Sequence, residues 1–128
     1  MGGKDMLMMI VDDEENTLLG LRDHFEDCEL VGQNDVLTMA FNGKQAQAII
    51  QQQTSLNFEI VITDINMPEM DGIQLTSWIK ENFPTIIVIL ISSEEEPRDH
   101  KADAFVSKSR IMNELVKTIK QLVPEPGL

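Results

Sequence analysis

The sequence has few cysteines, few basic residues and no long apolar run. Its single cysteine, Cys28, cannot form an internal disulfide, which suits a reducing compartment. Ten Lys and Arg stand against 22 Asp and Glu, giving a formal net charge of −12 that would repel nucleic acid. The apolar run at residues 6–11 is too short for a signal-peptide core or a membrane span. We therefore expect a cytoplasmic chain that binds neither nucleic acid nor membrane directly.

The length fits one compact domain. The chain has 128 residues, of which 42% are hydrophobic and 25% charged, as in ordinary folded proteins. Prolines at positions 124 and 126 close the last helical pattern. We predict one domain over residues 1–123, followed by a tail or the start of a linker over residues 124–128.

Apolar runs and helical spacing alternate along the chain. Continuous apolar runs predict strands buried on both faces at residues 6–11, 60–63 and 86–91, and weaker patterns predict strands at residues 36–40 and 104–106. Helical spacing separates them, and the clearest stripe is Ile111, Leu115, Ile119 and Leu122, with Ser109 as the expected N-cap. We expect Met8, Met9, Met39 and Met112 to be core residues. This order predicts a doubly wound α/β fold around a parallel sheet.

Polar residues follow four of the predicted strands. Asp12 and Asp13 come after the first, Asp64 after the third, Ser92 after the fourth and Lys108 after the fifth. In open α/β sheets the ligand site lies beyond the carboxyl ends of the strands. Carboxylates crowded there repel one another unless a cation compensates, and oxygen ligands favour Mg2+. The sequence therefore predicts a magnesium site at this edge.

Over nearly its whole length the chain resembles the receiver domain of two-component response regulators. The matching motifs are the acidic pair Asp12-Asp13, the stretch TDINMPEMDG at residues 63–72, Ser92, and Lys108 in AFVSK. The resemblance implies a flavodoxin-like, five-stranded (βα)5 fold. It also implies that Asp64 accepts a phosphoryl group from a phosphohistidine on a sensor histidine kinase or phosphotransfer protein.

The resemblance also assigns a role to each site residue. It implies that Mg2+ is held by Asp13, Asp64 and the main-chain carbonyl of Asn66, with Asp12 acting through a water molecule. Lys108 and the Ser92 hydroxyl would neutralise the oxygens of the transferring phosphoryl group.

Two further pairs of residues take their roles from the same resemblance. Ser92 and Phe105 would form the conformational switch that follows phosphorylation. Asn66 and Glu94 occupy the two positions that tune phosphate lifetime in the family. Because the same pair of residue types occurs in chemotaxis regulators that lose phosphate quickly, we hypothesise a short-lived phosphoprotein.

The sequence departs from the family pattern in two places. Ser109 follows Lys108 where many receivers have proline, so we expect a trans peptide bond there. Ser92 and Lys108 are 108 − 92 = 16 positions apart, several fewer than receivers usually carry. The fourth helix should therefore be short or missing, with room for about one or two turns and with Pro97 only in its first turn. We predict that any partner-binding or homodimer face differs from the common one.

Three other functions are alternatives to a phosphate-accepting receiver: a degenerate receiver, a phosphatase and a nucleotide-binding protein. The departures raise the chance of a degenerate receiver that acts only as an interaction module. A phosphatase of the haloacid dehalogenase type needs a second acid two residues after its nucleophile. This chain has Asn66 there, which cannot act as a general acid, so that function is disfavoured. A nucleotide-binding protein is excluded as well, because NGKQ at residues 42–45 lacks the preceding glycine and the Ser or Thr of a phosphate-binding loop. Taken singly, residues 12–15 would be an acidic helix start and Phe105 a core filler.

Overall fold

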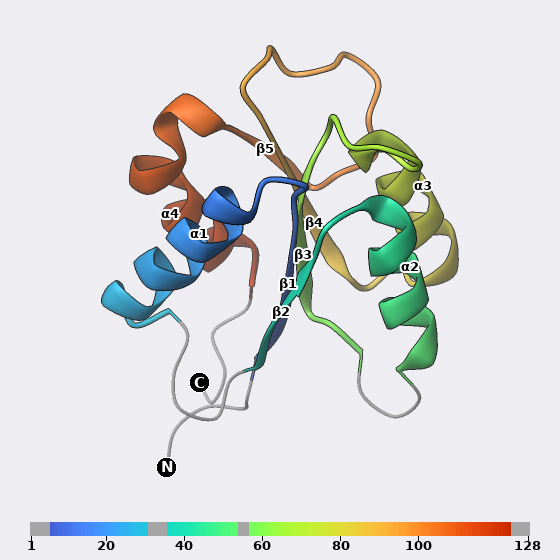
Figure 1. The fold of residues 1–128 in the computed structure, drawn as a ribbon, viewed down its shortest axis with the longest axis horizontal. Helices are drawn as coiled ribbons and strands as arrows, with labels where there is room; N and C mark the ends of the chain where they lie inside the picture. The colour runs from blue at the N-terminus through green and yellow to red at the C-terminus, as the bar shows by residue number, and fades with distance from the viewer. Residues whose placement is uncertain (1–5, 31–35, 54–56, 124–128) are drawn as a thin grey trace.

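The computed structural model describes residues 6–30, 36–53 and 57–123. Its centre is a five-stranded parallel sheet in the order β2-β1-β3-β4-β5 (Figure 1). The strands are β1 (Leu7–Val11), β2 (Val36–Ala40), β3 (Ile60–Asp64), β4 (Ile87–Ser92) and β5 (Ala104–Ser107). The predicted tail over residues 124–128 lies outside the described residues.

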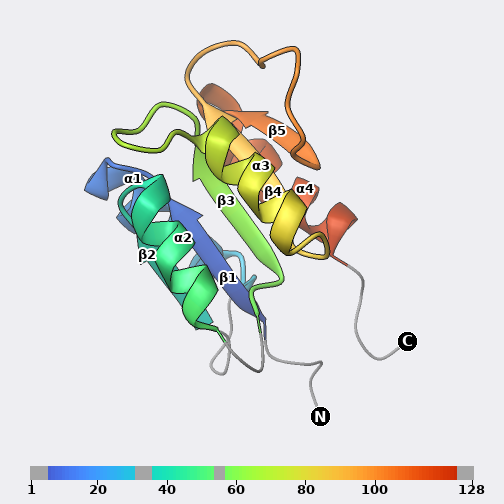
Figure 2. The same cartoon turned by 90° about the vertical axis from the view of Figure 1, so that its right-hand side faces the viewer.

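Four α-helices cover the two faces of the sheet. They are α1 (Glu15–Asp27), α2 (Gly43–Gln52), α3 (Gly72–Asn82) and α4 (Ile111–Leu122). Helices α1 and α4 lie on one face, and α2 and α3 lie on the other (Figures 1 and 2). The predicted flavodoxin-like, doubly wound fold is therefore confirmed. No helix within the described ranges is long and apolar enough to cross a membrane.

Each face of the sheet has its own apolar core, because neighbouring strand residues point to opposite sides. Met8 packs in the cluster with α1 and α4, and Met9 in the cluster with α2 and α3. Both methionines are buried as predicted, and Met39 is partly buried. The prediction for Met112 was wrong: its side chain is 51% exposed, because it lies next to the buried stripe of α4 and not within it.

The start of α4 also differs from the prediction. A 3-10 turn, η1 (Lys108–Arg110), precedes the helix, and Ser107 caps this turn by accepting a hydrogen bond from the Ser109 N–H. Ser109 is thus the capped residue and not the cap. The described residues contain no cis peptide bond, so the predicted trans bond after Lys108 is confirmed.

The segment between β4 and β5, residues 93–103, contains no helix. It forms the orange loop at the carboxyl edge of the sheet in Figure 1. The sequence predicted a (βα)5 fold with a fourth helix that is short or missing, and the shortened helix of that prediction was wrong, because no helix stands between β4 and β5. Pro97 cannot donate a helical hydrogen bond, and its ring would clash with the preceding turn of a helix, so the segment could hold a helix only after this residue.

Candidate functional site

The register of the parallel strands brings the predicted site residues to one edge. Val11 pairs with Thr63, so Asp12 and Asp64 each follow a matched pair of neighbours in β1 and β3. Asp64 pairs with Ile91, which places Ser92 one step beyond it in β4. Ser92 in turn pairs with Ser107, and Lys108 comes next. The carboxyl edge therefore collects residues from four strands that are far apart in sequence.

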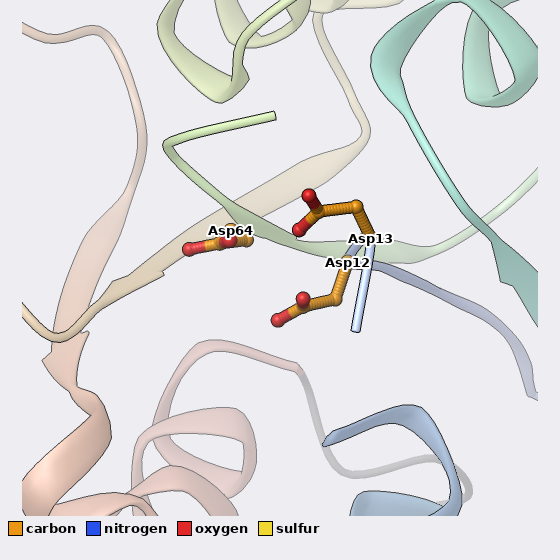
Figure 3. Close-up of side chains that lie close together, drawn as sticks. All are labelled: Asp12, Asp13 and Asp64. Atoms are coloured by element: carbon orange, nitrogen blue, oxygen red, sulfur yellow. The ribbon is translucent and has the colours of Figure 1, made fainter. Parts of the chain in front are cut away.

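Three carboxylates converge at this edge. Asp12, Asp13 and Asp64 each offer a carboxylate oxygen, and these oxygens lie within 4.8 Å of one another. In Figure 3 the side chains of Asp12 and Asp13 extend from the end of β1 toward Asp64. Asp12 and Asp64 are 0% and 6% exposed, whereas Asp13 is open to solvent. The cluster thus has a buried floor and one exposed member.

Lys108 is the cation that the structure places in this cluster. Its Nζ lies 2.9 Å from Asp12 Oδ2 and 3.5 Å from Asp64 Oδ1. The exposed Glu14 lies farther from the ammonium, at 3.7 Å. Burial alone would lower the pKa of Lys108, but its close ion pair with Asp12 and the charge of Asp64 outweigh burial and raise the pKa. Lys108 therefore stays protonated and bridges two strand ends.

The Asp64 carboxyl experiences opposing influences. Burial and then the charge of Asp12 raise its pKa to about 6, although Lys108 and the Ile65 N–H act in the opposite direction. The Ile65 N–H donates to Asp64 Oδ1 at 2.9 Å and so fixes the orientation of the carboxylate. One ammonium does not balance three carboxylates, but the raised pKa of Asp64 reflects its burial first and the negative charge of Asp12 second.

The donor set fits a hard divalent cation. All three converging groups are carboxylates, the ligand type that Mg2+ prefers, and the surplus of negative charge is what a bound cation would relieve. The open side at Asp13 leaves room for water and for a substrate oxygen in the coordination sphere of such a cation. Asp12, Asp13 and Asp64 are the residues that could hold a metal.

The remaining predicted residues lie around this cluster. Ser92 is buried, and its Oγ accepts a hydrogen bond of 3.0 Å from the Glu94 N–H. The side chains of Asn66 and Glu94 are exposed. Phe105 is partly buried in β5, where it pairs with Leu90. The structure thus brings Ser92 and Phe105 to neighbouring strands.

Some features of the site escaped the sequence analysis. The role of the Ile65 N–H depends on backbone geometry, which has no sequence signal. Gly72 has a steric role, because a Cβ there would lie 2.9 Å from the Ile65 Cα and closer still to the Asp64 carbonyl oxygen. Asp71 caps α3 in a reciprocal capping box with Gln74, a pattern that the sequence D-x-x-Q could have revealed.

Comparison with known proteins identifies the family. The family model of the response regulator receiver domain matches residues 8–120, nearly the whole chain. This chain is a response regulator receiver domain. The prediction made from the motifs is thereby confirmed, and the receiver is a signalling domain of two-component systems.

Several relatives show the extent of the similarity. The chain is 32% identical over 123 residues to the uncharacterized transcriptional regulatory protein YhcZ of Bacillus subtilis, covering 88% of this chain and 53% of that protein. It is 23% identical to the response regulator protein VraR of Staphylococcus saprophyticus, covering 89% of this chain and 54% of VraR. This receiver therefore spans about half the length of these curated relatives.

Among solved structures, the response regulator TrrA of Thermotoga maritima, crystallised in complex with Mg(2+)-BeF, is 26% identical. It matches with a TM-score of 0.76 over 92% of this chain and 99% of TrrA. A receiver domain of Methanospirillum hungatei matches with a TM-score of 0.78 at 20% identity, covering 92% of this chain and 93% of that one. The second similarity bears on the fold alone.

Proposed function

We propose that this receiver domain accepts a phosphoryl group on Asp64 in a Mg2+-dependent reaction and changes conformation as a result. The observation that carries the proposal is the convergence of Asp12, Asp13 and Asp64 within 4.8 Å, with the Lys108 ammonium 3.5 Å from Asp64. The crystallisation of the similar TrrA in complex with Mg(2+)-BeF supports it. The donor we propose is a phosphohistidine of a sensor histidine kinase or phosphotransfer protein.

The proposed metal ligands are Asp13, Asp64 and the main-chain carbonyl of Asn66, with Asp12 acting through water. Bound Mg2+ would neutralise part of the negative charge on the carboxylates and on the phosphoryl oxygens. The Ile65 N–H holds the Asp64 carboxylate in a fixed orientation, so the free Asp64 oxygen can approach phosphorus in line with the leaving group.

The transfer exchanges one bond to phosphorus for another. An Asp64 oxygen forms a bond to phosphorus while the bond between phosphorus and the imidazole nitrogen of the donor breaks, and the electron pair leaves with the imidazole. Lys108 remains protonated because Asp12 pairs with it, so its ammonium can neutralise a phosphoryl oxygen throughout. Lys108 therefore acts as a fixed cation and not as an acid.

The switch we propose starts at Ser92. In this structure the Ser92 Oγ accepts the Glu94 N–H at 3.0 Å, so a turn of the hydroxyl toward a phosphoryl oxygen would exchange this bond for another. Phe105 of the adjacent strand would move into the space so released. Because Glu94 lies near the start of the loop at residues 93–103, we propose that this loop responds first. The lifetime roles of Asn66 and Glu94 stay predictions, as do the domain limits at residues 1–123 and a homodimer face unlike the common one.

Phosphoryl uptake from acetyl phosphate tests the proposal. The intact mass of the full chain should rise by one phosphoryl group when Mg2+ is present, and not in EDTA. Asp64→Asn should abolish the gain, whereas Asp71→Asn, which alters a helix cap outside the cluster, should keep it. No gain in the parent chain with Mg2+ would overturn the proposal and favour a degenerate receiver that acts only as an interaction module.

A further inference from the structure

The start of α2 packs against the loop that follows Asp64. The two segments lie side by side in both views of the fold (Figures 1 and 2). At the contact point Gly43, the first residue of α2, faces Met70. A Cβ added to Gly43 would lie 2.8 Å from the Met70 Cβ and Cγ and closer still to its carbonyl oxygen, although real Cβ atoms keep at least 3.0 Å. Only glycine allows this approach without moving one of the two segments.

The α2 side of the contact is firmly held. The Asn42 side chain caps α2 by accepting a 2.8 Å hydrogen bond from the Gln45 N–H. The Gln45 side chain in turn accepts a hydrogen bond of 2.6 Å from the Phe41 N–H. Gly43 itself is buried, and so is Ala46 one turn later. A methyl group at position 43 would therefore displace the Met70 loop more readily than it would displace the helix.

The loop side connects directly to the phosphoacceptor. The Gly72 N–H donates to the Ile65 carbonyl at 2.8 Å and closes the loop at its base. The Met70 N–H donates to the Pro68 carbonyl at 2.8 Å, and Glu69 between them adopts a left-handed φ of 68°. A left-handed φ is strained for a residue other than glycine, so the contacts on either side of Glu69 must hold the loop in this conformation. A shift at Met70 is thus passed along the loop to Ile65, whose N–H orients Asp64.

From these contacts we propose that Gly43 is a positioning residue for phosphoryl transfer. It touches neither metal nor phosphoryl group, and it sets the position of residues 65–70 by letting Met70 rest against α2. The inference rests on the proposed function, because that loop carries the Asn66 carbonyl assigned to Mg2+ and the N–H that orients Asp64. The NGKQ stretch, which has no phosphate-loop chemistry, thereby gains a role.

Glycine-to-alanine substitutions at matched positions test the proposal. Gly43→Ala should slow phosphoryl uptake from acetyl phosphate about tenfold at saturating Mg2+, since misplacement by about 1 Å can cost up to 100-fold. It should also weaken binding of Mg2+ alone, measured by calorimetry. Gly20→Ala is the control: a Cβ there meets nothing within 4 Å, so uptake and Mg2+ binding should match the parent chain. Circular dichroism and urea denaturation report the folded fraction, to which each rate is normalised.

A second variant keeps the test decisive if Gly43→Ala fails to fold. Met70→Ala shortens the other side of the same contact without adding an atom, and Met70 is only partly buried. It should slow uptake about threefold relative to Gly20→Ala, because the loop loses part of its support. Normalised rates and Mg2+ affinities equal to those of Gly20→Ala in every folded variant would overturn the positioning role while phosphoryl transfer stands. A parent chain that binds Mg2+ without accepting phosphate would remove the proposed function; if Gly43→Ala still weakened Mg2+ binding in that chain, Gly43 would keep a positioning role for the metal site alone.

Discussion

Asp64 is the residue in which burial most strongly disfavours the charged form of a carboxyl group. The exposed fraction of Asp64 is 6%, and its carboxylate lies close to those of Asp12 and Asp13. In a protein without metal, such a group weakens the folded state in its charged form, because the unfolded chain leaves the same charge in water. The same crowding is what a bound cation would relieve. The burial and crowding of these carboxylates would therefore both lower the stability of the metal-free protein and favour the binding of a metal.

We expect Asp64→Asn to stabilise the metal-free protein at neutral pH. The Asp64 pKa is raised from 3.8 to about 6, so the folded state holds this proton more tightly than the unfolded state. Stability therefore falls as the pH rises from about 4 to about 6, and the loss persists above that range. At about 1.4 kcal/mol per pKa unit, the substitution should recover on the order of 2–3 kcal/mol at about pH 7.5 and little near pH 4.

Urea denaturation in EDTA at these two pH values measures the difference. The exposed Asp99→Asn serves as the control for removing one negative charge elsewhere on the chain. An equal gain from Asp64→Asn at both pH values, or a gain no larger than that of Asp99→Asn, would show that Asp64 is not strained by its neighbours.

For single residues, the sequence predicted that Asp12, Asp13 and Asp64 lie together, but it did not predict the backbone groups and close contacts around them. Asp12, Asp13 and Asp64 could be placed together because each follows a recognisable strand, and strand ends meet at one edge. The Ile65 N–H and the close approach of Gly43 to Met70 depend on loop conformation. No residue pattern encodes that conformation in a single sequence.

Among the elements, the loop at residues 93–103 departs most from the expected architecture. Without a helix, its return to the sheet depends on Asp103. The Asp103 Oδ2 accepts the Val88 N–H at 2.8 Å and pairs with the Lys80 ammonium at 2.7 Å. Lys80 also donates to the Ile86 carbonyl at 2.8 Å. Asp103 thus connects the end of the loop to both α3 and β4.

We predict that Asp103→Ala lowers the free energy of unfolding by about 1–3 kcal/mol, because it removes an acceptor from a backbone N–H and a partner from Lys80. Asp99→Ala, an exposed substitution in the same loop, should change it by less than about 0.5 kcal/mol. Urea denaturation of both variants gives the comparison. Equal stabilities would mean that the loop is held by other contacts.

The sequence predicted most elements because their signals are strong. Strands β1, β3 and β4 are continuous apolar runs, and the stripe of α4 buries Leu115 and Ile119. The cap at the start of the last helical segment was misplaced because Ser107 and Ser109 are both serines within one turn, and composition alone cannot say which one adopts the extended backbone of a cap; Ser107 caps η1, and α4 itself begins after Arg110 without a side-chain cap. The spacing limited the fourth helix but could not choose between short and absent.

In the whole molecule, one apolar core packs on each face of the single sheet. Segments from both faces meet at the carboxyl edge of this sheet. The topology could be predicted because strand and helix alternate and parallel crossovers follow few paths. The formal net charge of −12 adds to the local excess at the site and favours binding of cations over anions. In the proposed reaction, the phosphoryl donor would approach more easily once a bound cation had reduced this negative charge, in line with the proposed dependence on Mg2+.

Chemical mapping of the phosphorylated side chain decides whether Asp64 itself carries the phosphoryl group, as we propose. Borohydride reduces an acyl phosphate and converts the aspartate that carried it to homoserine. After treatment with acetyl phosphate and Mg2+, peptide mass analysis should find homoserine at position 64 alone, and none in EDTA. Homoserine at a different aspartate, or none anywhere despite a phosphorylated intact mass, would contradict the account.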